Sequence, residues 1–150
     1  MKKQSIIDLF ENNELKISIL YRVYSQKIPA HKNFWEKISQ EEVNHAKEIA
    51  RSFLKEKECF EENKFTRGVV NYVSGYVDEK IEEARKNKIS HTEAINIALR
   101  VEQSMLEKKC FDMFIPKNAT VKEVIERLNK DTKRHVEQLR KELKKLEPKR

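Results

Sequence analysis

Five residues that could ligate a metal ion interrupt the apolar stripes of four predicted helices: Glu14, Glu42, His45, Glu102 and His135. Burying an ionised carboxylate in an apolar core is costly unless the group is paired or coordinates a metal. Carboxylate oxygens and imidazole nitrogens together suit iron or manganese. The pattern therefore indicates either a metal site or a metal-free polar network that fixes how the helices pack.

The spacing of these residues places them at one level. Each helix reaches its polar position about 15 residues from a predicted connection, either 29–32 or 116–119. At about 1.5 Å per residue, all four helices bring that residue near mid-height. In addition, Glu42 and His45 form a Glu-x-x-His tetrad, which places a carboxylate and an imidazole on one helical face where both can reach one ion.

Helix signals along the chain define the elements that must position these residues. Two capping boxes, Ser90 with Glu93 and Thr120 with Glu123, mark the starts of two helices. The helices before Pro29 and Pro116 end at these prolines. The region after Thr66 is rich in β-branched valine, yet its apolar residues recur at helical spacing. The expected helices cover 5–29, 33–57, 66–84, 90–113 and 120–147.

The composition supports an all-α single domain spanning residues 1–150. The chain has two glycines, three prolines and 38% charged residues, which argues against sheet folds with many tight turns and against glycine-rich phosphate loops. The short connections at 29–32 and 116–119 predict two antiparallel helical hairpins, and the long middle segment, partly helical, crosses from one to the other. The expected architecture is a four-helix bundle with one long crossover.

Several segments together resemble a known family. The similar segments are Glu14 with Tyr21 seven positions later, residues 41–46 (EEVNHA), residues 98–102 (ALRVE) and residues 131–137 (DTKRHVE). The chain resembles the ferritin-like superfamily over essentially its whole length, most closely the rubrerythrin-type proteins that lack a rubredoxin domain. This resemblance implies a ferritin-like bundle in which four carboxylates and two histidines hold two irons per chain.

Carried onto this sequence, the resemblance assigns Glu14, Glu42 and His45 to one iron, with Glu42 as a potential bridge. Glu102 and His135 would serve the other iron.

The sequence departs from the family on its last helix. Thr132 stands where the family has a glutamate, and the nearest acid, Asp131, lies about 100° away around the helix. A hydroxyl is a poor iron ligand compared with a carboxylate. The pattern permits a complete pair through Asp131, a single metal, or a degenerate site without metal.

The resemblance also implies a choice of activities: peroxide reduction, iron oxidation or simple iron binding. Tyr21 is the candidate catalytic side chain, placed to hydrogen-bond a carboxylate of the site or to relay an electron. Because the sequence has no CxxC pair for a rubredoxin iron, an electron donor would be a separate protein. The family commonly pairs or assembles further, so a homodimer or higher homo-oligomer is expected.

The remaining features predict a surface rather than a second site. Lys and Arg exceed Asp and Glu by 32 to 25, a net charge of +7, but the lysines are scattered and indicate a solvated surface. A nucleic-acid ligand is therefore not expected, although a DNA-binding mini-ferritin is an alternative. No secretory signal or membrane-spanning run is present, and Cys59 and Cys110 are expected to be free thiols in the cytoplasm.

His31 and His91, at helix starts, are expected at the surface. The main alternative function is a metal-free bundle that acts as an interaction module.

Overall fold

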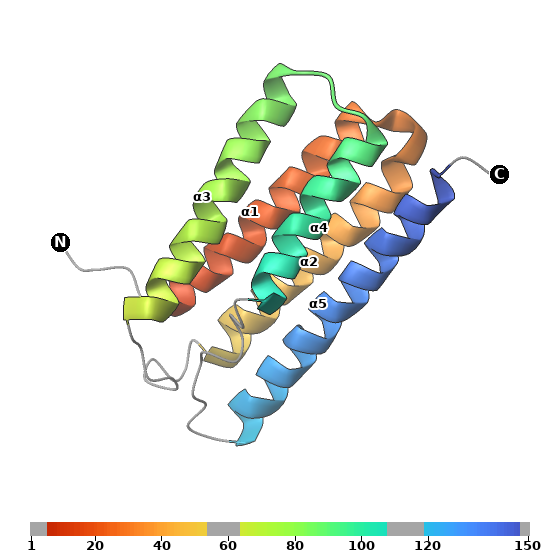
Figure 1. Ribbon diagram of the computed structural model, residues 1–150. Helices are drawn as coiled ribbons and strands as arrows, with labels where there is room; N and C mark the ends of the chain where they lie inside the picture. Colours follow the sequence, from red (N-terminus) through yellow and green to blue (C-terminus); the bar gives the residue numbers. More distant parts are fainter. Residues whose placement is uncertain (1–5, 54–63, 108–118, 148–150) are drawn as a thin grey trace.

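A computed structural model describes residues 6–53, 64–107 and 119–147 of the chain (Figure 1). These ranges are helical and contain no strand, which confirms the all-α class for the described part. The elements in order are α1 (Ile6–Lys27), the short 3-10 helix η1 (Pro29–His31), α2 (Lys32–Phe53), α3 (Lys64–Lys86), α4 (His91–Glu107) and α5 (Ala119–Lys145).

The α-helices lie side by side along a common direction (Figure 1). Helices α1 and α2, joined through η1, pack against each other over most of their length, and α3 lies along α1. Helix α4 packs mainly on α5, and α5 also contacts α2. This arrangement places α1, α2, α4 and α5, which carry the predicted ligands, around a shared interior.

Local signals explain the helix boundaries at Ser90 and Pro29, whereas α5 begins at Ala119, one residue before the predicted cap Thr120. The Ser90 hydroxyl accepts a hydrogen bond of 3.1 Å from the Glu93 backbone N–H, as a capping box requires, and α4 begins at the next residue. Pro29 ends α1 and opens η1. The valine-rich segment is helical, as its spacing predicted, because its valines are buried on one face. The predicted helix ends at 54–57 and 108–113, with Cys59 and Cys110, lie outside the described residues.

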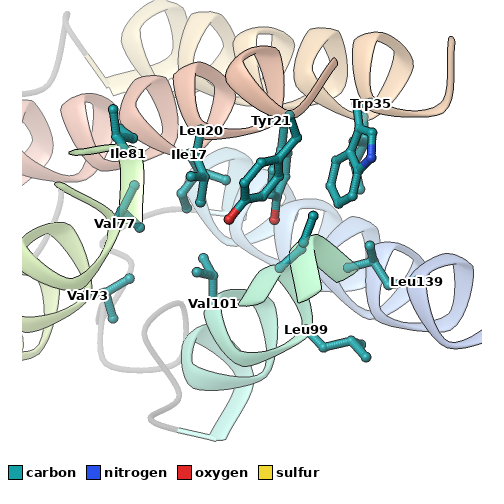
Figure 2. Packing of buried hydrophobic residues seen from close by; sticks show 14 of the residues in the cluster. Ile17, Leu20, Tyr21, Trp35, Val73, Val77, Ile81, Leu99, Val101 and Leu139 are labelled. Carbon is teal, nitrogen blue, oxygen red and sulfur yellow. The ribbon is translucent and has the colours of Figure 1, made fainter. Parts of the chain in front are cut away.

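The apolar core fills the space between the helices that carry the predicted ligands (Figure 2). Side chains of α1 point toward those of α3 on one side and toward α4 and α5 on the other. Buried members shown there include Ile17, Leu20, Tyr21, Trp35, Val73, Val77, Ile81, Leu99, Val101 and Leu139. Polar groups enclosed by this core therefore have little contact with solvent.

Two isoleucines on α1 test this packing. Ile17 is 1% exposed and Ile19 is 41% exposed. We expect Ile17→Ala to lower the free energy of unfolding by about 3 kcal/mol, because it leaves a cavity in the core. Ile19→Ala should change it by less than about 0.5 kcal/mol. Urea unfolding of both variants measures the difference, and equal effects would contradict this placement of α1.

Candidate metal centre

The five predicted ligand residues are all buried and converge from four helices. Their exposed fractions are 3% for Glu14, 1% for Glu42, 5% for His45, 2% for Glu102 and 0% for His135. Helix α2 supplies two of them, while α1, α4 and α5 supply one each. The structure therefore brings together the set that the apolar stripes singled out.

These residues form two groups that share Glu42. In the first group, His45 Nδ1 lies 3.5 Å from Glu42 Oε2 and 3.9 Å from Glu14 Oε2. In the second, His135 Nδ1 lies 3.0 Å from Glu42 Oε1 and 3.6 Å from Glu102 Oε1. Within each group the three ligand atoms lie within 4.8 Å of one another. Glu42 thus directs one carboxylate oxygen to each half, the arrangement that a bridging carboxylate would have.

The two histidines present the same ring nitrogen to the interior. Both direct Nδ1 at the shared carboxylate, and their rings stack with centroids 5.4 Å apart and an angle of 24° between planes. The outer nitrogens face carboxylates: His45 Nε2 lies 3.3 Å from Asp131 Oδ2, and His135 Nε2 lies 2.8 Å from Glu41 Oε2. Such outer partners orient a ligating imidazole and fix which nitrogen carries the proton.

Asp131 therefore lies beside the centre rather than in either group of ligand atoms. Its side chain is 30% exposed and contacts the outer nitrogen of His45. Glu41 holds the matching position on His135, and Arg134 donates a 3.1 Å hydrogen bond to its other oxygen. Sequence reasoning did not assign Glu41 a role. The sequence held no clear signal for this role, because Glu41 is partly exposed and its partner lies on another helix.

Burial and charge set the protonation of the site. Burial, reinforced by the charge of Glu42, raises the pKa of Glu14 to about 8. Burial lowers the pKa values of the two histidines, but nearby carboxylates outweigh it and raise them to about 11 for His45 and about 12 for His135. The hydrogen bond from His135 holds the pKa of Glu41 at about 2. Without a metal ion and below about pH 8, the interior therefore holds two imidazolium rings, a protonated Glu14 and the remaining carboxylates.

Two atoms of this network lack a hydrogen bond within the described residues. Glu42 Oε1 and His135 Nδ1 are both buried, and although they lie 3.0 Å apart, their directions do not meet hydrogen-bond geometry. Buried polar atoms without partners are rare and call for an explanation. A cation between them would coordinate both atoms at once, so the donor set fits a metal ion.

Tyr21 and Thr132 border the second group. The Tyr21 hydroxyl donates a 2.8 Å hydrogen bond to Glu102 Oε1, and burial with the nearby Glu102 charge raises the pKa of Tyr21 well above its ordinary value. It therefore acts as a neutral donor that holds Glu102. The buried Thr132 hydroxyl donates 3.0 Å to the Leu128 carbonyl of its own helix. It makes no bond to His135, so Thr132 is not the partner of that imidazole.

One sequence expectation was wrong. His91 was expected at the surface, but it is 8% exposed and accepts a hydrogen bond from Trp35. It begins α4, and its ring contacts Trp35 and Phe34 of α2 and Glu142 of α5, which bury it. His31 is partly exposed and stacks on the His91 ring.

Comparison of the chain with protein-family models, curated proteins and solved structures gives no match. Among the described helices, none is long and apolar enough to cross a membrane.

Proposed function

We propose that this protein is a ferritin-like four-helix bundle that holds a two-iron carboxylate centre and carries out oxidoreductase chemistry, peroxide reduction or iron oxidation. The observation that supports it best is the shared, buried Glu42, which directs one oxygen to each of two Glu–His groups. A polar network alone needs no such division into two halves.

The donor set favours this reading. Each half offers two carboxylates, one of them shared, and one imidazole, the ligand types that iron and manganese prefer. Three protein groups per half leave coordination positions open for an oxidant. Bound iron would supply the electrons with which peroxide or dioxygen is reduced.

The chain's own residues prepare the site for an ion. Asp131 and Glu41 hold the outer nitrogens of the two imidazoles, and Tyr21 holds Glu102. Glu14 and both imidazoles must release protons before their inner atoms can coordinate. The apolar residues around the inner ligand atoms limit their contact with bulk water. The sequence has no CxxC pair for a rubredoxin-type iron in addition to the two-iron centre, so we assign electron delivery to a separate protein.

Metal stoichiometry tests the proposal. Protein purified without oxygen, reconstituted with ferrous iron and desalted should hold close to two irons per chain by elemental analysis. A chelator should then lower its melting temperature. One iron per chain would contradict the two-metal centre and confine binding to one half. A folded protein with no iron would favour the metal-free interaction module.

Replacing Asp131 separates a ligand from an outer partner. If Asp131 only orients His45, Asp131→Asn should still bind two metal ions, with affinity for one of them lowered about 10-fold to 100-fold. Titration with ferrous iron measures both quantities. Loss of one ion from the stoichiometry would instead show that Asp131 moves inward and coordinates.

Thr132 offers the reverse test, because a glutamate there would add the carboxylate that the resembled family has. Thr132→Glu should tighten ferrous iron binding about 10-fold or more and lower the stability of the metal-free protein, since it buries another acid. The uncharged Thr132→Gln is the matched control and should not tighten binding. Equal affinities of the two variants would contradict the expected direction of this side chain.

A further inference from the structure

Trp35, the one tryptophan of the chain, lies in an aromatic cluster between the candidate centre and one end of the helices. Its side chain is fully buried. Its ring centroid lies 5.6 Å from that of Tyr21 and 5.8 Å from that of His91. Figure 2 shows the indole beside Tyr21, whose hydroxyl end reaches toward the interior. Because Tyr21 hydrogen-bonds Glu102, the cluster connects with the centre.

Hydrogen bonds fix the protonation state of His91. The Trp35 indole N–H donates to His91 Nδ1 over 3.1 Å, and an indole nitrogen can only donate. Nδ1 is therefore the unprotonated nitrogen, and Nε2 carries the hydrogen that it donates to Glu142 Oε1 over 3.2 Å. Burial lowers the pKa of His91 and outweighs the opposing effect of Glu142. The lowered pKa favours the neutral ring.

The same hydrogen bonds argue against a second metal site at this end. His31, His91 and Glu142 have ligand atoms close enough to surround a cation. However, Nε2 of His91 carries a proton as long as Trp35 donates to Nδ1, so it has no lone pair for a metal. The cluster is better described as a hydrogen-bonded chain, in which the Trp35 indole N–H donates to His91 and His91 donates to Glu142.

We propose that Trp35 is a one-electron redox residue for the buried centre and that His91 takes up its indole proton when it is oxidised. This inference rests on the proposed function, which supplies the oxidant. The aromatic contacts give the electron a short route, and His91 with Glu142 gives the proton a place to go.

Hydrogen peroxide is the oxidant in this step. Reduction of one peroxide molecule to two water molecules takes two electrons and two protons, and the protons come from solvent. If bound iron supplied only one of these two electrons, the Trp35 ring would supply the other. The indole N–H bond then breaks and its proton bonds to His91 Nδ1, which leaves a neutral indolyl radical beside an imidazolium paired with Glu142.

Return of Trp35 to its reduced state requires an external one-electron reductant, and the cluster has a solvent-exposed residue through which that electron can enter. The His31 ring stacks on His91 with centroids 3.6 Å apart and planes 3° apart, and the His31 side chain is 34% exposed. An electron that enters here returns Trp35 to its reduced state, and the proton moves back from Nδ1 to the indole. The external donor is oxidised by one electron, and no net proton is left on the cluster.

Tyr21 rather than Tyr24 is the connection toward the centre, although the Tyr24 ring lies closer to Trp35, at 4.9 Å. The buried Tyr24 hydroxyl has no hydrogen-bond partner within the described residues, so its oxidation would leave a proton with no acceptor. Tyr21 instead donates to a carboxylate of the site.

Laser photo-ionisation of Trp35 in the metal-free protein tests the proton step without any iron. Visible absorption distinguishes the neutral indolyl radical from the protonated cation radical. Wild-type protein should give the neutral form at once, whereas His91→Gln, which still accepts the indole hydrogen bond but cannot take the proton, should prolong the cation form roughly 100-fold. The control His31→Gln should behave as wild type. The same protonation state and lifetime in wild type and His91→Gln would overturn the proposal.

Electron paramagnetic resonance tests the redox step. Iron-loaded protein mixed with hydrogen peroxide and frozen should show an indolyl radical, absent from Trp35→Phe that binds the same amount of iron. If Trp35→Phe does not fold, wild-type protein that carries deuterium-labelled tryptophan identifies the radical, because the label must narrow an indolyl signal. Two bound irons without an indolyl radical would overturn this inference and leave the proposed function intact. A protein that binds no iron would end both, and elemental analysis tells the two failures apart.

Discussion

Replacing Glu42 with alanine should reduce the iron content from two ions per chain to nearly none. Each half of the centre uses one oxygen of this carboxylate, so its loss leaves each half with a single carboxylate and one imidazole. Such two-ligand sites hold metal weakly in competition with water. Elemental analysis after anaerobic reconstitution measures the loss, and circular dichroism verifies that the helices remain.

Matched variants distinguish loss of the shared ligand from loss of a ligand of one half and from a change elsewhere on the helix. Glu36 lies on the same helix but is exposed and pairs with Lys32, so Glu36→Ala should keep both irons. Glu14→Gln and Glu102→Gln each remove a carboxylate from one half only and should each retain about one iron per chain. Two irons in Glu42→Ala would show that the halves do not share this residue.

The glutamate and histidine positions of the centre could be predicted because burying an acid is costly. An acid on an apolar stripe needs a partner, and helical rise converts sequence distance from a turn into height. For this reason Glu14, Glu42 and Glu102 were identified from the sequence and lie together in the structure. The β-branched segment at 66–84 was also predicted as helix, since spacing outweighs modest propensity.

The surroundings of the centre were less accessible to sequence reasoning. Glu41 and Asp131 lie at the borders of their stripes, and a partly exposed acid has no energetic need that would single it out. His91 begins a helix, where exposure is common, and its burial depends on Trp35, 56 positions away. Such contacts follow from how helices are placed against one another, which periodicity alone does not determine.

Metal binding should reverse the pH dependence of stability. In the metal-free protein the pKa of Glu14 rises from 4.5 to about 8, and those of His45 and His135 rise from 6.5 to about 11 and about 12. Through these three groups the folded protein binds more protons than the unfolded chain above pH 4.5, so their effect is that stability falls as pH rises. The lowered pKa of His91 opposes this effect below about pH 6.5. The lowered pKa of Glu41 acts oppositely only below pH 4.5, as pH falls toward about 2. Each extra proton contributes about 1.4 kcal/mol per pH unit.

With metal bound, the same three groups have given up their protons. Unfolded histidines still bind protons near pH 6, so the loaded folded state now holds fewer protons than the unfolded chain, and its stability rises with pH. Between about pH 5.5 and 7.5, we expect the melting temperature to fall by several degrees without metal and to rise by several degrees with it, at about 2–4 °C per kcal/mol. Differential scanning calorimetry with and without a redox-inert divalent ion such as Mn²⁺ measures both slopes.

A control isolates the centre from the other titratable groups of the chain. Glu42→Ala should show no difference between its slopes with and without Mn²⁺, because it binds no ion at either pH. Parallel slopes in the wild type, with a protein that nevertheless binds two ions, would mean that the ions do not displace these protons. The ligands would then have to be groups other than the buried imidazoles and Glu14.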